Sequence, residues 1–345
     1  MTDKNTTKED LSYVQKVWST VGIVAFLVIL ILIARVAFNV LLMMLAGSLI
    51  AVYFHGLGDI IQRKTKMKRG PAMGISVVGS FLILAALLWF MGTKIQAQIA
   101  ELSDSLPHTI SNARAKLAET SLGQKVLDYL SDDGNSQKMF TTAQHFFSTS
   151  FGVMGNIYVI FLLSIFFTVN PSMYKNGIIM MFRPKHKELA TCVMDRLSLS
   201  LKAWLKTTML SIVLISIFLF TGLSIMGIPA ALVLALFAGM LKIVPNFGSL
   251  VAMIPGVLLA LTISTDTAII VTLLYVVSQT IVSSVITPIV QNRMINLPPA
   301  LTIVSQIIMG TLSGALGVIL AVPLLAIVFI LVDELYVKKI NREAA

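Results

Sequence analysis

One stretch of the sequence restricts the possible folds more than any other. Between Thr207 and Val332 the chain has 126 residues, of which only three are charged: Lys242, Asp266 and Arg293. A soluble domain carries charge on about a quarter of its residues, so water cannot be the main solvent of this segment. Over the whole chain, 57% of the residues are apolar and 12% are charged. We therefore expect an all-α polytopic membrane protein.

The N-terminal half supplies further membrane spans. A helix needs about 20 apolar residues to cross the hydrocarbon core. Such runs occur at Val17–Ala34, Val36–Gly58, Ala72–Gly92 and Phe151–Val169. We expect the first run to be retained, because no small-residue cleavage site follows it. With the C-terminal segments, the total is about eight membrane segments.

Polar insertions divide the chain into five parts. We predict N-terminal spans in residues 1–93, an extracytoplasmic insertion in 94–150, a fourth span and a basic cytoplasmic helix in 151–206, a transport core in 207–337 and a cytoplasmic tail in 338–345. Apolar residues of the insertion recur at intervals of three and four, which is typical of an amphipathic helix. That seam packs on its own chain or joins protomers.

The basic residues in the loops predict the orientation in the membrane. Gln62–Gly70 has five basic residues and no acid, whereas residues 94–150 have five basic and six acidic residues. Positively charged loops stay in the cytoplasm. We therefore place both termini in the cytoplasm. The net charge of +10 is explained by these loops, so no nucleic-acid partner is expected.

Two segments of the C-terminal half resemble each other. Ile228–Leu232 (IPAAL) is similar to Leu297–Leu301 (LPPAL) at an offset of 69 residues, and Gly248 matches Gly317 at the same offset. One ordinary span, Thr267–Thr287, lies between the copies, so the copies have opposite orientations. An inverted repeat of broken helices is typical of transporters whose solute site lies near the midplane.

Each copy predicts a broken or re-entrant hairpin. Two short apolar half-helices flank a polar tip, Lys242–Ser249 in the first copy and Gly310–Gly317 in the second. The second half-helix contains a proline in both copies, Pro255 and Pro323. Non-helical backbone at membrane depth is tolerated only where protein or a water cavity satisfies it. The tips are therefore the expected solute path.

The sequence has no motif of an enzyme, a cofactor site or a metal site. It lacks GxGxxG, P-loop and HExxH patterns, and its four histidines lie far apart. Ser313-Gly314 is similar to an intramembrane serine nucleophile, but no histidine follows His186 to act as its base. We expect no enzymatic activity, no cofactor and no metal.

The polar residues of the core are the candidate site. The predicted solute path comprises Lys242, Pro245, Asn246, Gly248, Ser249, Gln279, Pro288, Gly310, Ser313, Gly314 and Gly317. Asp266, the only acid between Thr207 and Val332, is the candidate for a coupling ion, or else a solvated cap at a helix start. Lys242 either reaches the interface or binds the solute. Amides and hydroxyls suit a neutral, oxygen-rich solute, and they also join helices.

The signature of a known family is found in these motifs. The autoinducer-2 exporter family of bacterial permeases resembles this chain from about Val17 to Val337, most specifically at Val244–Ser249, Ile254-Pro255, Thr287-Pro288…Arg293 and Gly310…Gly314…Gly317…Ala321-Val-Pro323. The chain departs from the family pattern at Asn292, where glycine is usual, and at Lys242, where an acid is frequent.

The resemblance implies a homo-oligomeric permease of the bacterial inner membrane that exports autoinducer-2 or a similar signal or metabolite. Some members are credited with sodium/proton exchange, so a sodium(cation)/proton antiporter is the first alternative. A non-transporting oligomeric membrane scaffold, assembled through the seam of residues 94–117, is the second. The implied partners are the lipid bilayer, a small polar solute, H+ or Na+, and further copies of the chain.

Overall fold

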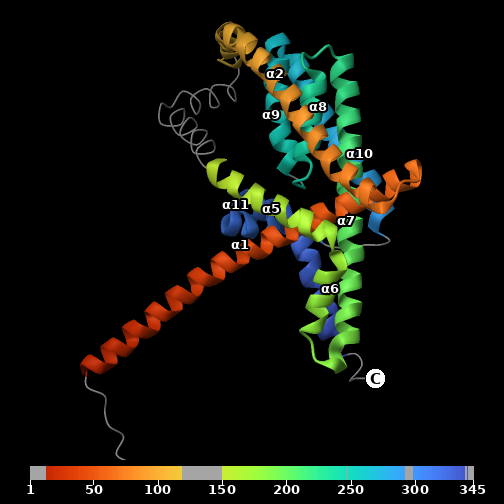
Figure 1. Ribbon diagram of the computed structural model, residues 1–345. Coiled ribbons are helices and arrows are strands. Elements are labelled where there is room, and N and C mark those ends of the chain that lie inside the picture. Colours follow the sequence, from red (N-terminus) through yellow and green to blue (C-terminus); the bar gives the residue numbers. More distant parts are fainter. Residues whose placement is uncertain (1–12, 119–149, 246, 292–297, 339, 341–345) are drawn as a thin grey trace, which may run out of the picture.

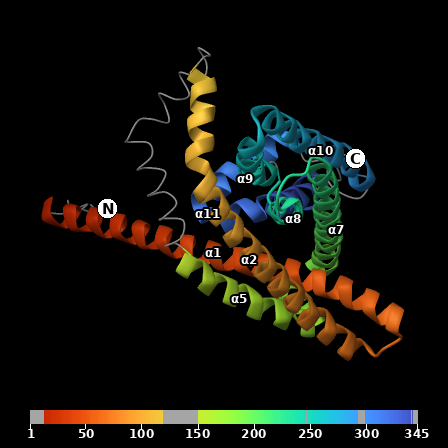
Figure 2. The ribbon, with the colours of Figure 1, turned by 90° about the horizontal axis from the view of Figure 1, so that it is seen from above.

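The described part of the protein is helical throughout. A computed structural model describes residues 13–118, 150–245, 247–291, 298–338 and 340, and these residues form no β-strand. The elements fall into two groups (Figures 1 and 2). An N-terminal group of three helices packs against a C-terminal cluster that holds both predicted hairpins. The all-α fold is confirmed.

The N-terminal group comprises α1 (Tyr13–Thr65), α2 (Arg69–Ala118) and α5 (Ser150–Val169). The two spans predicted within α1 form one unbroken helix, with no break at Arg35 between them. No glycine or proline lies between Gly22 and Gly47, and nothing local interrupts the helix. Its 53 residues rise about 80 Å, more than twice the thickness of a bilayer core.

Helix α2 runs without interruption from the third span into the predicted insertion. The helix expected over residues 94–117 is confirmed by the backbone, and α2 ends at Ala118. The contacts of its apolar seam and residues 119–149 lie outside the described part of the chain. The fourth span, α5, bends by 90° into α6 (Pro171–Met180). Pro171 starts α6 because proline suits the first turn of a helix.

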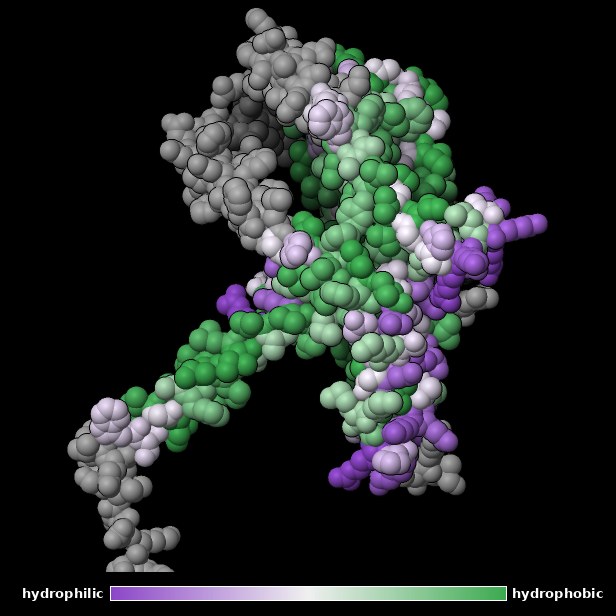
Figure 3. All heavy atoms as spheres, viewed as in Figure 1, coloured by the Kyte–Doolittle hydropathy of each residue, from purple (hydrophilic) through white to green (hydrophobic). Residues whose placement is uncertain are grey.

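The C-terminal cluster starts with a basic helix that becomes a span, as predicted. Its elements are η1 (Pro184–His186), α7 (Lys187–Ile225), α8 (Ala231–Leu241), α9 (Phe247–Ile263), α10 (Thr265–Gln291), α11 (Pro299–Val332) and the π-helical turn η2 (Asp333–Val337). Within the described residues, five helices are long and apolar enough to cross a membrane, or six with the bent α5–α6 pair. Helices α8 and α9 are shorter. Apolar side chains cover the visible surface of the spans (Figure 3).

Helix α7 joins two separate cores. Its C-terminal half buries Ile215, Leu219 and Leu223 against α8, α9 and α10. Its N-terminal half buries Trp204 in a second core with residues of α1, α5 and α11. In lipid such packing depends on close approach and not on removal of apolar surface from water. Gly239 of α8 provides that approach, because a Cβ atom there would meet the hydroxyl of Ser216 in α7.

Candidate functional site

The first predicted hairpin is present. Helix α8 ends at Leu241 and α9 begins at Phe247, so the break falls within the predicted tip. The N–H of Gly248 donates to the carbonyl of Val244, which closes the turn. A Cβ atom on Gly248 would fall on the carbonyl oxygen of Leu241. Only glycine therefore lets the two half-helices meet at this point.

The second hairpin is also present, with a narrower break than expected. Helix α11 leaves the helical region at a single residue, Gly314, with φ 62° and ψ −144°. Residues with a side chain avoid this conformation. Gly317 then comes against the carbonyl oxygen of Met309, where a Cβ atom would clash. Gly248 and Gly317, matched in the sequence, thus share one structural role.

The two hairpins pack against opposite halves of α7. The first lies beside the Ile215–Leu223 half, as part of the core described above. The C-terminal end of α11 lies beside the basic half, where Arg196 forms ion pairs with Asp333 and Glu334. Figure 1 shows α8 and α9 beside the upper part of α7 and the end of α11 beside its lower part. An inverted repeat predicts this arrangement.

A hydrogen bond joins the first tip to the second repeat. The Nε2 atom of Gln306, in the first half of α11, donates to the carbonyl oxygen of Pro245 at 2.9 Å. Gln306 is 1% exposed, and its Oε1 atom has no hydrogen-bond partner among the described residues. An unpaired buried acceptor costs about 1–3 kcal/mol, so this oxygen is ready to accept a donor.

A buried polar cluster lies beside the first tip. Lys242 donates from Nζ to Oε1 of Gln279 at 2.6 Å, and Ser249 donates from Oγ to the same oxygen at 2.7 Å. Lys242 is 9% exposed. A lysine that reached the interface would be exposed, so the geometry favours the interpretation that Lys242 faces the interior. Gln279, on α10, connects the tip to an ordinary span.

The second tip connects to the N-terminal helices. The hydroxyl of Ser313 donates to Oδ1 of Asn39 in α1 at 2.8 Å. Sequence reasoning missed Asn39 because it treated this part of α1 only as an apolar span. An amide in a long apolar run is itself a signal, since such groups need partners in lipid. The signal gives no indication of which partner the amide finds.

Asp266 lies apart from the polar cluster of Lys242, Ser249 and Gln279. Asp266 is exposed in the first turn of α10, where the hydroxyl of Ser264 accepts from the N–H of Thr267, and no described contact joins Asp266 to the tips. Gly310 lies against Val318, across the break in α11. Pro288 lies in α10, and Asn246 lies outside the described residues. Within the described residues, no group of His, Cys, Asp or Glu side chains is arranged to hold a metal ion.

Comparison with known proteins agrees with this architecture. The model of the AI-2E family transporter matches residues 23–337. YueF of Bacillus subtilis is 25% identical over 308 residues, with 83% of this chain and 81% of YueF covered. YhhT of Escherichia coli K12 is 22% identical over 315 residues, with 88% and 87% covered. Both relatives are named as proteins expected to act in transport.

The family match covers most of the chain, including both hairpins and the spans that hold them. A transporter of this family has the lipid bilayer and a small solute as its partners. The apolar helices agree with a location in the bacterial inner membrane. The chain belongs to the AI-2E transporter family and is a multi-pass membrane transport protein.

Proposed function

We propose that the chain carries a small, polar, oxygen-rich solute, with autoinducer-2 as the expected cargo, between the two hairpin tips and out of the cell. The observation that carries the proposal is the contact of the first tip with the second repeat: Gln306 of one repeat donates to Pro245 of the other. Polar groups from both repeats thus converge where the backbone is broken. In a transporter this is where a solute exchanges its water for protein groups.

The chemistry of the cluster suits hydroxyl groups. Lys242 has three N–H donors and gives one to Gln279, which leaves two for solute oxygens. The free Oε1 of Gln306 accepts from a solute hydroxyl. A polyol with neighbouring hydroxyls can satisfy both kinds of group. An apolar solute would leave all of them unpaired, at a cost of about 1–3 kcal/mol each.

Passage requires the tips to separate. The hydrogen bond between Gln306 and Pro245 joins the first tip to the second repeat, and the closure of each tip depends on a glycine at a backbone carbonyl. We therefore test the tips with Gly248→Ala and Gly317→Ala in proteoliposomes loaded with labelled autoinducer-2. Each substitution places a Cβ atom on a carbonyl oxygen, and we expect efflux to fall at least tenfold.

The matched control is Gly74→Ala in α2, where a Cβ atom meets nothing within 4 Å. This variant should transport at the wild-type rate. Size-exclusion profiles and thermal unfolding of all three variants separate a damaged path from a damaged fold. Wild-type efflux in both Gly248→Ala and Gly317→Ala would reject the hairpin tips as the path.

The same vesicles test the antiporter alternative. Sodium is added to inside-acid vesicles, and the internal pH is followed. We expect the pH gradient to persist. Asp266, the only acid between Thr207 and Val332, is exposed, and no described contact joins it to the tips. A collapse of the gradient that disappears in Asp266→Asn would instead establish cation/proton exchange.

A further inference from the structure

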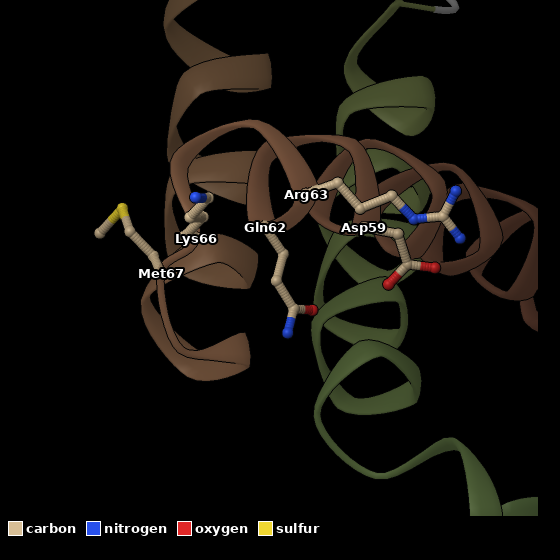
Figure 4. Close-up of a pocket in the computed structure, with 5 residues that line it drawn as sticks. All are labelled: Asp59, Gln62, Arg63, Lys66 and Met67. Atoms are coloured by element: carbon tan, nitrogen blue, oxygen red, sulfur yellow. The ribbon is translucent and has the colours of Figure 1, made fainter.

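The turn between α1 and α2 forms an open pocket that the transport mechanism does not use. Its volume is about 490 Å³, and it is lined by Asp59, Gln62, Arg63, Lys66 and Met67. Figure 4 shows the first three side chains on the last turns of α1, with Lys66 and Met67 on the turn that follows. The pocket therefore lies where the first helix ends and the chain reverses.

Backbone geometry fixes the cations of this turn. Lys66 has a left-handed φ of 55°, and its N–H donates to the carbonyl of Gln62 at 2.8 Å. This arrangement ends a helix tightly and sets the direction of the next residues. Helix α2 then starts only three residues later, at Arg69. Gln62, Arg63 and Lys66 are thus held around one space.

The charge of the turn is not neutralised within the described structure. Five cations occur between Arg63 and Arg69, and Asp59 is the only acid that lines the pocket. None of these five side chains forms an ion pair or a hydrogen bond with a described residue. The other basic region differs, because there Lys175 pairs with Asp195 and Arg196 pairs with Asp333 and Glu334. The pocket therefore attracts an anion from outside the chain.

Apolar side chains beside the cations indicate what kind of anion. Met67 lines the pocket, and Ile60 of α1 and Ile75 of α2 are exposed on either side of the turn. A soluble anion gains nothing from this surface. A phospholipid gains from both parts, because its phosphate meets the cations while its acyl chains continue along the helices.

We propose that this pocket binds the headgroup of an anionic phospholipid. Lys66 donates to the phosphate oxygens and the amide of Gln62 donates to the headgroup, while Arg63, which extends past Asp59 in Figure 4, adds positive charge beside them. The five basic residues and the absence of acids in Gln62–Gly70 predict that this turn lies at the cytoplasmic face, where anionic lipids attract basic segments. The inference is independent of the transported solute and of the path through the hairpins.

The test measures lipid binding to the full-length protein in neutral detergent, so membrane orientation plays no part. A fluorescent phosphatidylglycerol is titrated, with phosphatidylcholine as the neutral lipid. We expect Arg63→Gln/Lys66→Gln to weaken phosphatidylglycerol binding roughly 25-fold, because each cation near an anionic lipid contributes about 1 kcal/mol, or fivefold. Phosphatidylcholine binding should stay unchanged.

The matched control is Lys185→Gln/Lys187→Gln, which removes the same charge from exposed positions at the start of α7. It should keep wild-type affinity. An equal loss in this control would show general attraction to a basic protein and would reject the pocket as the binding site.

Competition by millimolar inorganic phosphate, without dependence on acyl chains, would show a site for soluble anions and would reject a phospholipid as the ligand. If the double variant aggregates, the single variants Arg63→Gln and Lys66→Gln, each expected to lose about fivefold, decide the question.

Discussion

At the scale of single residues, one amide oxygen organises the candidate site. Oε1 of Gln279 accepts from the ammonium of Lys242 and from the hydroxyl of Ser249. No carboxylate contacts the ammonium among the described residues. A neutral amide therefore holds a buried cation. Such a group is expensive to leave unpaired, since hydrogen bonds to charged groups contribute about 1.5–3 kcal/mol.

The sequence predicted which residues are polar at depth but not how they pair. Lys242 stands out because its neighbours are apolar, and Ser249 and Gln279 stand out because they lie in a segment with almost no charge. Their partners depend on how α10 is rotated against the first tip, and rotation is set by packing that no single sequence displays. The pairing of Asn39 was not predicted either, because its partner Ser313 is 274 residues away in the chain.

Substitution of the shared acceptor tests this pairing. We expect Gln279→Leu to lower the free energy of unfolding by about 2 kcal/mol, because the ammonium of Lys242 loses its acceptor. Unfolding by denaturant in micelles measures the change. Lys242→Met/Gln279→Leu removes donor and acceptor together and should recover most of the stability, since paired polar groups can be replaced by apolar ones at little cost.

Transport by the same two variants separates structure from function. Both should lose efflux, because both lack the polar groups that meet the solute. Recovery of efflux together with stability in the double variant would show that Lys242 and Gln279 serve only to join helices.

At the scale of secondary-structure elements, the hairpins were predictable and the first helix was not. Glycine and proline are local signals, and they mark both tips in the sequence. Helix α1 has no such signal between Gly22 and Gly47, so a count of apolar residues suggested two spans where the structure has one helix. Hydropathy predicts which residues lie in lipid, whereas a turn between two spans needs local signals such as glycine or proline.

The end of α11 is fixed by an ionic cluster that can be tested. Arg196 pairs with Asp333 and Glu334, and Lys338 also pairs with Glu334, whose side chain is 5% exposed. We expect Arg196→Gln to lower the free energy of unfolding by about 2 kcal/mol, because a buried carboxylate loses a charged partner. Chemical denaturation in micelles provides the measurement.

The control for this cluster is Lys175→Gln. Lys175 pairs with Asp195, and both side chains are more than one-third exposed. Exposed pairs contribute about 0–1 kcal/mol, so this variant should unfold almost as the wild type does. An equally large effect of the two substitutions would mean that burial of Glu334 does not determine the strength of the cluster.

At the scale of the whole molecule, the spans form a membrane body from which half of α1 projects. The apolar side chains of α1 before Val36 are exposed all round, and Figure 1 shows this part of the helix extending away from the other spans. Residues 17–58 are too many for one crossing of a core about 30 Å thick. Two crossings would put the N-terminus on the same face as the basic turn of residues 66–68, as predicted, but they need a bend near Arg35 that the unbroken α1 of the structure does not have.

Labelling from the two faces of the membrane tests this topology. We place a reporter by Ser19→Cys in a Cys192→Ser background and apply an impermeant maleimide to right-side-out and inverted vesicles. We expect labelling only in inverted vesicles, with the N-terminus in the cytoplasm. The native Cys192, which is exposed on α7 near the predicted cytoplasmic loop, is the reference and should label from the same face.

Labelling of the Ser19→Cys reporter only in right-side-out vesicles would contradict two crossings. It would show that α1 traverses the bilayer once as a straight rod. The N-terminal prediction would then be lost, while the predicted placement of the basic loops would stand if Cys192 still reacted from inside.

The single oxygen that serves two donors has a consequence for selectivity. Oε1 of Gln279 already accepts two hydrogen bonds, from Lys242 and Ser249, before any cargo arrives. A cargo hydroxyl that donates to this oxygen must therefore displace one of them, and it gains only the difference between the new bond and the old one. Binding by such replacement is weak, and the cargo leaves as readily as it enters. A carrier with this chemistry favours turnover over retention.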